Sequence, residues 1–180
     1  ELVEAEKRSN QIVQVGMQRR SYDLYLDARK VIASGTLGQI RMVRSWWLNN
    51  QIAPSTKTLN GKLDWEAWQG PAIRRPLDPN RFLNWRLFHD YAGGIVADQG
   101  AHVYDGIHLL MSAGYPTAVT AAAGKPHRDG FDTPESVVVT AEYTEDFIGV
   151  FSINYAAMKY KSRNDQMNHL DGDKARMDIG

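Results

Sequence analysis

The chain has 180 residues, of which 43% are hydrophobic, and this is enough for one full domain with a packed core. The composition excludes disorder for the bulk of the chain, because disordered segments are poor in apolar residues. Lysine and arginine together number 21, as do aspartate and glutamate, so the formal net charge is zero. A balanced charge argues against nucleic acid or an anionic membrane as partner, since both bind through a basic surplus.

The chain contains no cysteine, which excludes disulfides, thiol nucleophiles and thiolate metal ligands and fits a reducing compartment. No stretch approaches the roughly 18 apolar residues that a membrane span needs. The first eight residues are charged and have no apolar centre, so they do not resemble a signal peptide. The chain begins with Glu1 rather than methionine, so we expect a fragment or a processed product. The expected location is the cytoplasm.

At the N-terminus, residues 2–9 have the pattern of an amphipathic helix, which ends at the polar pair Ser9-Asn10. The β-branched run over residues 11–16 predicts a short strand. A helix followed by one strand is half of an α/β unit, and a single strand cannot satisfy its own backbone hydrogen bonds. This segment is therefore expected to be cut from a larger sheet.

Helical spacing next predicts a helix over residues 23–33, which Gly35 ends in the left-handed conformation. Its apolar face is expected to consist of Leu24, Ala28, Val31 and Ile32. Residues 39–48 predict a strand, and the polar residues 49–62 predict a loop. A helical turn with Asp64 as its N-cap is expected over residues 64–68, followed by a long irregular loop over residues 71–81, which are rich in proline and arginine.

In the second half, Gly93 and Gly94 precede a helix that is expected to run to about Met111. Strands are predicted over residues 117–123, 136–143, 147–155 and 166–171. A tight turn over residues 144–146 joins two of them, and residues 172–180 are expected to lie in a hairpin.

The segment from Asp90 to Asp105 carries the densest chemistry. On a regular helix, Asp98, His102 and Asp105 stand at i, i+4 and i+7 and share one face. Histidine titrates near neutrality, and acidic neighbours raise its proton affinity and fix its tautomer, which suits proton transfer to or from a substrate hydroxyl. Gly100 within the helix costs about 1 kcal/mol relative to alanine, which indicates close packing or the approach of a ligand.

Two other interpretations of this face stay open. An aspartate and a histidine four residues apart on a helix are commonly a structural pair. Asp98 and His102, with Asp105, are also residue types that ligate a divalent metal, although no His-Glu-x-x-His pattern is present.

Aromatic and basic residues surround this segment. Trp85-Arg86 and Tyr91 offer flat surfaces and a guanidinium fork that suit a sugar, a nicotinamide ring or an anion, or they are packing residues. For Trp65 and Trp68, packing is the interpretation that we prefer. Arg19, directly after the first predicted strand, is either part of a solvated turn or a polar group at a ligand crevice.

Taken in order, these residues resemble the Gfo/Idh/MocA family of NAD(P)-dependent oxidoreductases. The similar pieces are residues 13–20, 32–40, 63–71, 79–86 and 172–180, although Ala175 and Arg176 depart from the family's Gly-Asp-Lys-Gly-Thr-Leu hairpin. The most specific piece is the Gly-Gly-x3-Asp-x-Gly-x-His-x2-Asp run from Gly93 to Asp105. Each piece is short, and their joint order carries the resemblance.

The resemblance implies a two-domain enzyme that moves a hydride between NAD or NADP and a sugar or cyclitol hydroxyl. An N-terminal Rossmann domain binds the dinucleotide. A C-terminal α+β domain, with an open, mainly antiparallel sheet and helices on one face, holds the substrate. The exposed face of that sheet serves as a subunit interface, so a homo-oligomer is expected.

The resemblance also implies residue roles. His102 is the acid/base group, and Asp98 positions the substrate and tunes His102. Substrate binding is expected of Arg19, Tyr91 and Asp105, and cofactor binding of Trp85 and Arg86. No metal is expected.

The glycine-rich dinucleotide fingerprint and the family's Glu-Lys-Pro segment are absent. Residues 1–18 are therefore expected to be a remnant of the Rossmann domain, and residues 19–180 the substrate domain, truncated at its C-terminus. The chain alone should bind no cofactor and show no turnover. Three alternatives are a non-catalytic module that pairs through its sheet, an NAD-dependent glycoside hydrolase of the same family, and metal-assisted hydrolysis at Asp98 and His102.

Overall fold

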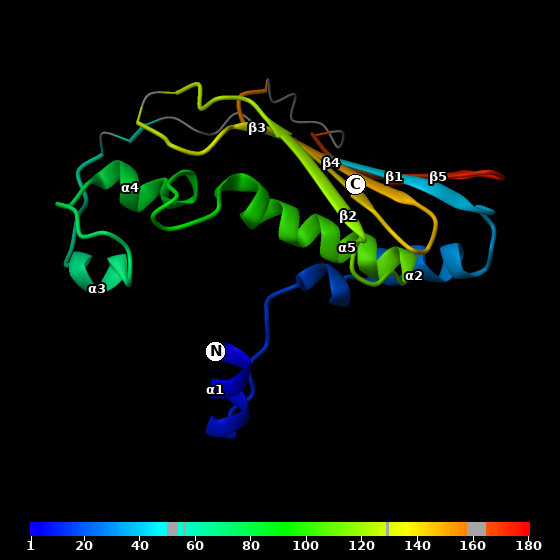
Figure 1. Cartoon of the computed structure of the whole chain (residues 1–180), viewed down its shortest axis with the longest axis horizontal. Coiled ribbons are helices and arrows are strands. Elements are labelled where there is room, and N and C mark those ends of the chain that lie inside the picture. The colour runs from blue at the N-terminus through cyan, green and yellow to red at the C-terminus, as the bar shows by residue number, and fades with distance from the viewer. Residues whose placement is uncertain (50–53, 56, 129, 158–164) are drawn as a thin grey trace.

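The chain has an α+β fold in which helices cover one face of a mainly antiparallel sheet (Figure 1). The computed structural model describes residues 1–49, 54–55, 57–128, 130–157 and 165–180. Its helical elements are α1 (Leu2–Ser9), η1 (Gln18–Ser21), α2 (Asp23–Ala33), α3 (Trp65–Gln69), α4 (Pro79–Leu83), η2 (Trp85–Leu87), η3 (Val96–Gly100) and α5 (Ala101–Met111).

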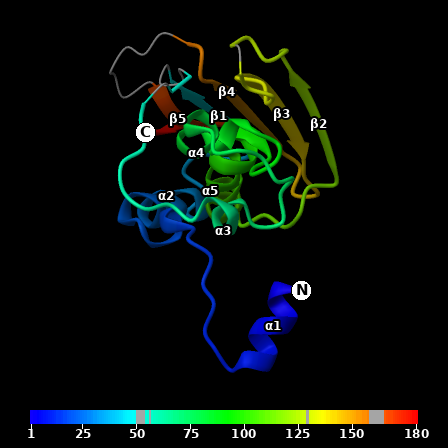
Figure 2. The same cartoon turned by 90° about the vertical axis from the view of Figure 1, so that its left-hand side faces the viewer.

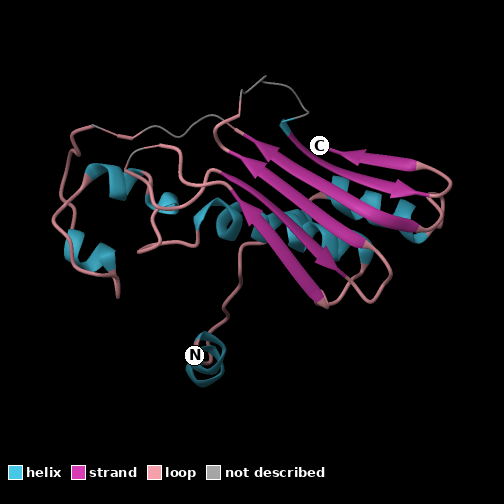
Figure 3. Cartoon of the chain, turned by 45° about the horizontal axis from the view of Figure 1, so that its top comes forward, coloured by secondary structure: helices cyan, strands magenta, loops and turns pink. Residues whose placement is uncertain are grey.

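The described strands form one six-stranded sheet (Figure 3). They are β1 (Ile40–Leu48), β2 (Ala118–Ala123), β3 (Ser136–Glu142), β4 (Ile148–Asn154), β5 (Gln166–Gly172) and β6 (Arg176–Ile179). Their order is β2-β3-β4-β1-β5-β6, and all neighbours are antiparallel except β1 and β4, which run parallel. The predicted fold class, the predicted strands from residue 39 onward and the C-terminal hairpin are confirmed.

The core lies between the sheet and the helices α2 and α5, which pack against one face (Figure 1). Val43 of β1 and Phe151 of β4 point to this side and meet Ile107 and Leu110 of α5, and all four are at most 1% exposed. Burial of such side chains contributes roughly 1.5–3 kcal/mol each. No helix of the described part of the chain covers the opposite face of the sheet (Figure 3).

Helix α2 is confirmed at its predicted bounds, and Gly35 after it has φ 74. Its buried face is predicted in part, because Ala28 is buried and Ile32 packs against the core, but Tyr25 is buried as well. Leu24 and Val31 are 40% and 39% exposed. Tyr25 is one position from the expected stripe, and its large ring turns the helix so that positions 25, 28 and 32 face the core.

The N-terminal segment projects away from the sheet as a helix and an extended link (Figure 2). Helix α1 is confirmed, but it has no buried residue. The predicted strand over residues 11–16 is wrong in this structure, because these residues form neither strand nor helix. A strand needs a hydrogen-bonded neighbour, and none of the described segments pairs with this one. Ile12 is 97% exposed and Val15 is 70% exposed, so the apolar side chains of the link are uncovered.

The region between β1 and α5 contains two short α-helices, α3 and α4. In α3, Asp64 caps the helix as predicted, because its carboxylate accepts a hydrogen bond from the Ala67 N–H at 2.9 Å. The prediction of an irregular loop over residues 71–81 is wrong at its end, where α4 begins at Pro79. Asp78 caps α4 by accepting from the Asn80 N–H at 2.8 Å, and proline suits the first helical position. The described part of residues 49–62 is a loop, and residues 50–53 and 56 lie outside the described residues.

Candidate active site

The run from Gly93 to Asp105 begins with a glycine pair, and the second of these has a backbone conformation that other residues rarely adopt. Gly94 has φ 79, and a Cβ there would lie 3.2 Å from Cβ of Thr133, which is fully buried. A side chain would be strained both by the positive φ and by this contact. Gly94 therefore lets the chain turn into its helix while lying against the loop that leads to β3.

The helix itself is not regular. Residues Val96–Gly100 form the π-helical turn η3, which leads directly into α5 at Ala101, so the helix that the sequence predicted up to about Met111 is present but is not α-helical throughout. Gly100 lies buried at the junction, and a Cβ there would come within 3.3 Å of the Phe151 ring. Close packing against β4 therefore explains this glycine. π-Helical turns are rare and occur frequently at functional sites.

The three expected site residues do not interact with one another. The Asp98 carboxylate accepts hydrogen bonds at 2.7 Å from Arg86 Nε and from Gln99 Nε2. The Asp105 carboxylate instead pairs with Arg20. His102 is partly buried in the first turn of α5, and the described residues offer it no hydrogen bond or ion pair. The Asp98–His102–Asp105 face of a regular helix is therefore not formed as one network.

Tyr155 interacts electrostatically with Asp98, and the sequence analysis did not single it out. The residue lies directly after β4 and is 8% exposed. Burial, followed by the negative charge of Asp98, raises the pKa of Tyr155, while the charge of Arg86 and hydrogen bonds with Asn49 and Gln99 oppose the rise. The phenol is therefore protonated at neutral pH and can donate a hydrogen bond.

The strand register explains why Tyr155 and Asn49 meet. β1 and β4 are parallel neighbours, and Leu48 pairs with Asn154. The residues that follow, Asn49 and Tyr155, thus lie side by side, and the Asn49 N–H donates to the Asn154 carbonyl at 2.9 Å. Polar residues at the carboxyl ends of two strands were the available signal, but the pairing of these strands is not readable from the sequence.

Arg86 lies beside Asp98, and Trp85 lies beside Arg86. The Arg86 guanidinium stacks on the Trp85 ring at 4.2 Å from its centroid, and its Nε donates to Asp98. Their short helix η2 is held from behind by the loop before β3. The Leu87 carbonyl accepts from the N–H groups of Asp132 and Thr133, both at 3.2 Å. These two hydrogen bonds hold the segment from which Arg86 reaches Asp98.

Arg19 and Tyr91 are not joined to this cluster by any hydrogen bond among the described residues. Arg19 is only 8% exposed, and its guanidinium lies over the rings of Tyr25 and Trp47, so it is inside the domain where a pocket edge was expected. Tyr91 packs in an aromatic cluster at 4.9 Å from the Trp68 ring. In the same cluster, Trp65 and Trp68 stack on each other, in keeping with the packing role preferred for them.

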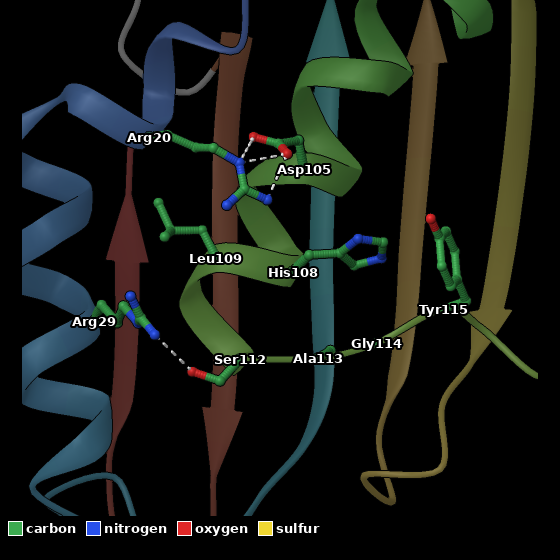
Figure 4. A pocket seen from close by; sticks show the side chains of 9 residues that line it. All are labelled: Arg20, Arg29, Asp105, His108, Leu109, Ser112, Ala113, Gly114 and Tyr115. Atoms are coloured by element: carbon green, nitrogen blue, oxygen red, sulfur yellow. Dashed lines mark hydrogen bonds and ion pairs between the residues drawn. The ribbon is translucent and has the colours of Figure 1, made fainter. Parts of the chain in front are cut away.

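A depression of about 530 Å³ opens beside the C-terminal half of α5 (Figure 4). Arg20, Asp105 and His108 are among the residues that line it, and Asp98 and His102 are not. The dashed lines in Figure 4 show that Arg20 is bound to Asp105 and Arg29 to Ser112. Four of the side chains that line this depression are thus paired with one another, and we take the cluster around Asp98 as the candidate site.

Neither a metal-binding cluster nor a membrane-spanning helix is found among the described residues. Within the described ranges, no group of three or more histidine, aspartate or glutamate side chains is placed to hold a metal ion. None of the helices that the structure describes is both long and apolar enough to cross a membrane.

Comparisons with known proteins agree on one family. The model of the GFO/IDH/MocA C-terminal domain matches residues 25–178. An inositol 2-dehydrogenase of Gluconacetobacter diazotrophicus is 38% identical over 58 residues, which are 32% of this chain and 17% of that protein.

Solved structures share the fold at low identity. An oxidoreductase of Thermotoga maritima superposes with a TM-score of 0.70 at 16% identity, over 99% of this chain and 46% of that one. The WlbA dehydrogenase of Bordetella pertussis, solved with NADH and UDP-GlcNAcA, superposes with a TM-score of 0.68 at 17% identity, over 99% of this chain and 45% of that one. The chain thus spans less than half the length of these relatives.

The family model covers most of the chain, and the mainly antiparallel sheet with helices on one face has the architecture expected of that domain. The chain therefore belongs to the Gfo/Idh/MocA family of oxidoreductases and carries its C-terminal domain.

Proposed function

We propose that the chain is the substrate domain of an enzyme that transfers a hydride between a sugar or cyclitol hydroxyl and NAD or NADP. The observation that carries this proposal is the cluster of Arg86, Asp98 and Tyr155. Asp98 lies one helical turn before His102, whose imidazole has no partner among the described residues. The name of the inositol 2-dehydrogenase relative and the UDP-sugar in the WlbA complex support this class of substrate.

Each group has a distinct role in the proposed reaction. When bound, the nicotinamide supplies the acceptor for the hydride that leaves the carbinol carbon. His102 takes the proton of the reacting hydroxyl as that hydride leaves, and returns it in the reverse direction. Asp98 accepts a hydrogen bond from a substrate hydroxyl, with the Arg86 hydrogen bond holding the carboxylate in place. Tyr155, protonated and buried, donates to a second oxygen of the substrate.

The residues present fit one side of a cofactor site. Trp85 offers a flat ring beside Arg86, so these two residues would flank the nicotinamide end of NAD or NADP. The glycine-rich turn that binds pyrophosphate is not in this sequence. We therefore assign residues 1–18 to a dinucleotide-binding domain and residues 19–180 to the substrate domain, and we expect the chain alone to bind no cofactor and to be inactive. Arg19, Tyr91 and Asp105 would then support the site from within the domain.

The uncovered sheet face suggests a homo-oligomer. Trp46 of β1, Val138 of β3 and Ile148 of β4 point to this side, and the last two are 44% and 37% exposed. Burial of such a face against a second copy would remove several large apolar side chains from water. We place this assembly in the cytoplasm.

The test uses the full gene product that contains this chain. We expect NAD- or NADP-dependent oxidation of at least one member of a panel of cyclitols, aldoses and UDP-sugars, followed as absorbance of the reduced cofactor. Asp98→Asn should reduce kcat/KM by roughly 10²-fold or more, since it removes a charged hydrogen-bond acceptor. A dimer or tetramer that oxidises no member of the panel and gives no melting shift with either cofactor would favour the non-catalytic module instead.

A further inference from the structure

A bidentate ion pair fastens α5 to the turn that precedes α2. Arg20 Nε lies 2.8 and 3.0 Å from the two Asp105 oxygens, and Arg20 Nη2 lies 2.7 Å from Oδ1 (Figure 4). The side chains of Asp105 and Arg20 are 15% and 50% exposed, so the pair is partly shielded from solvent. Arg20 Nε donates to both carboxylate oxygens while Nη2 lies at ion-pair distance from one of them, and these contacts limit both the distance and the orientation between η1 and α5.

Arg19, the residue before Arg20, packs against Gly106, the residue after Asp105. Gly106 is buried, and a Cβ there would lie 3.1 Å from the Tyr25 ring and 3.6 Å from Cδ of Arg19. Arg19 itself is buried over Tyr25 and Trp47. Consecutive arginines of η1 therefore contact consecutive residues of α5, one through charge and one through packing.

The position of this anchor matters because of the π-helical turn ahead of it. Asp98 lies in η3, whereas His102 lies in the first turn of α5, so their relative placement depends on where the π-turn gives way to the α-helix. π-Turns are rare and short, which makes such a junction sensitive to the forces on either side. Arg86 holds the segment ahead of the junction through Asp98, and Arg20 holds the segment behind it through Asp105.

We propose that Arg20, acting through Asp105, is a positioning residue that keeps His102 in register with Asp98. The inference rests on the function proposed above, and it assigns Asp105 a role other than direct contact with substrate. Because η1 directly follows the extended link, the same ion pair also fixes the catalytic helix relative to the point where the N-terminal segment enters.

The test compares Arg20→Gln and Asp105→Asn with Arg29→Gln in the full gene product. Arg29 is a matched control, because it also reaches α5 but bonds Ser112 at the other end of the helix, at 3.3 Å. Hydrogen exchange of the backbone amides of residues 98–105 is the first readout. We expect roughly tenfold faster exchange there in Arg20→Gln and Asp105→Asn, and no change in the control.

Steady-state kinetics is the second readout. Misplacement of a reacting group by about 1 Å costs on the order of 10²-fold, so we expect kcat to fall 10- to 100-fold in Arg20→Gln while KM for the cofactor is unchanged. The double variant Arg20→Gln/Asp105→Asn should be no worse than either single variant, because both remove one interaction. Arg20→Lys keeps the charge without the fork and should recover part of kcat.

The outcomes separate this inference from the proposed function. Exchange over residues 98–105 that matches the Arg29→Gln control overturns the anchoring role, and so does an unchanged kcat in an active enzyme. A wild-type protein that oxidises no polyol defeats the proposed function, whereas the exchange experiment still decides whether the ion pair holds the π/α junction.

Discussion

The two ends of α5 each present a histidine, and their surroundings differ. His108 near the C-terminal end shares a hydrogen bond of 2.9 Å between its Nε2 and the Tyr143 hydroxyl. Burial raises the pKa of Tyr143 to about 12, so this hydroxyl is protonated and can donate to the ring. His102 at the other end has no such partner among the described residues, although Asp98 lies one turn away.

This difference separates a structural histidine from a candidate catalytic one. A partnered imidazole next to a stacked aromatic pair, Tyr143 and Phe147, has one of its two ring nitrogens bonded within the fold. An imidazole without a partner beside a charged and hydrogen-bonded cluster can accept a proton from an incoming hydroxyl. Residue type alone does not distinguish the two histidines, whereas their spacing from Asp98 and their surroundings do.

The largest expected effect is on activity. His102→Ala should lower kcat of the full gene product by roughly 10²- to 10⁴-fold, because it removes the proton acceptor. His108→Ala should change kcat less than tenfold, since its bond to Tyr143 lies outside the proposed site. The two variants are compared under identical substrate and cofactor concentrations. Equal losses in both would abolish the distinction between the two ends.

A second prediction concerns the packing that supports the His102 end. Gly100→Val would push two methyl groups toward the Phe151 ring, which lies 3.3 Å from the position of a Cβ, and should destabilise the protein by about 1–3 kcal/mol. Ala101→Val adds the same branched side chain at the neighbouring exposed position and should cost under about 1 kcal/mol. Urea denaturation measures both free energies of unfolding. If Ala101→Val is the more costly variant, the contact at Gly100 is not tight.

The smallest expected effect is a pH dependence at the other end. Burial lowers the pKa of His108, with the charge of Arg20 acting in the same direction and those of Asp105 and Glu145 opposing it. Near pH 6.5 the unfolded chain therefore binds more protons than the folded one, so stability is full above that pH and falls as the pH is lowered through it. His108→Gln should flatten this part of the curve of melting temperature against pH between 5 and 7. A slope unchanged by the substitution would assign the pH dependence to other groups.

Much of the fold is readable from local patterns. Helix α2, the strands after residue 39 and the cap at Asp64 follow from spacing and turn chemistry that neighbouring residues determine. The strand expected over residues 11–16 failed because a strand depends on a partner, and none of the described segments supplies one. The buried face of α2 was predicted only in part, because the large ring of Tyr25 packs into the core while Leu24 and Val31 are exposed.

The candidate site was only partly predictable. The sequence motifs singled out Asp98, His102 and the Trp85-Arg86 pair, and the structure joins two of these residues, Arg86 and Asp98. Tyr155 and Asn49 were missed because they meet only through the parallel register of β1 and β4. The π-turn and the pairing of Asp105 with Arg20 were not predicted, since the close packing of Gly100 on Phe151 and the contact of Asp105 with Arg20 both involve segments distant in sequence.

The placement of β1 at the centre of the sheet has a consequence for how the chain folds. Both neighbours of β1, the strands β4 and β5, lie more than a hundred residues further along the sequence. The antiparallel neighbours β2, β3 and β4, and the hairpin of β5 and β6, can form from nearby residues. Closing the long loop to β1 carries a larger entropic cost and slows such topologies. We therefore expect β1 to insert late between two preformed halves, as the step that completes the sheet.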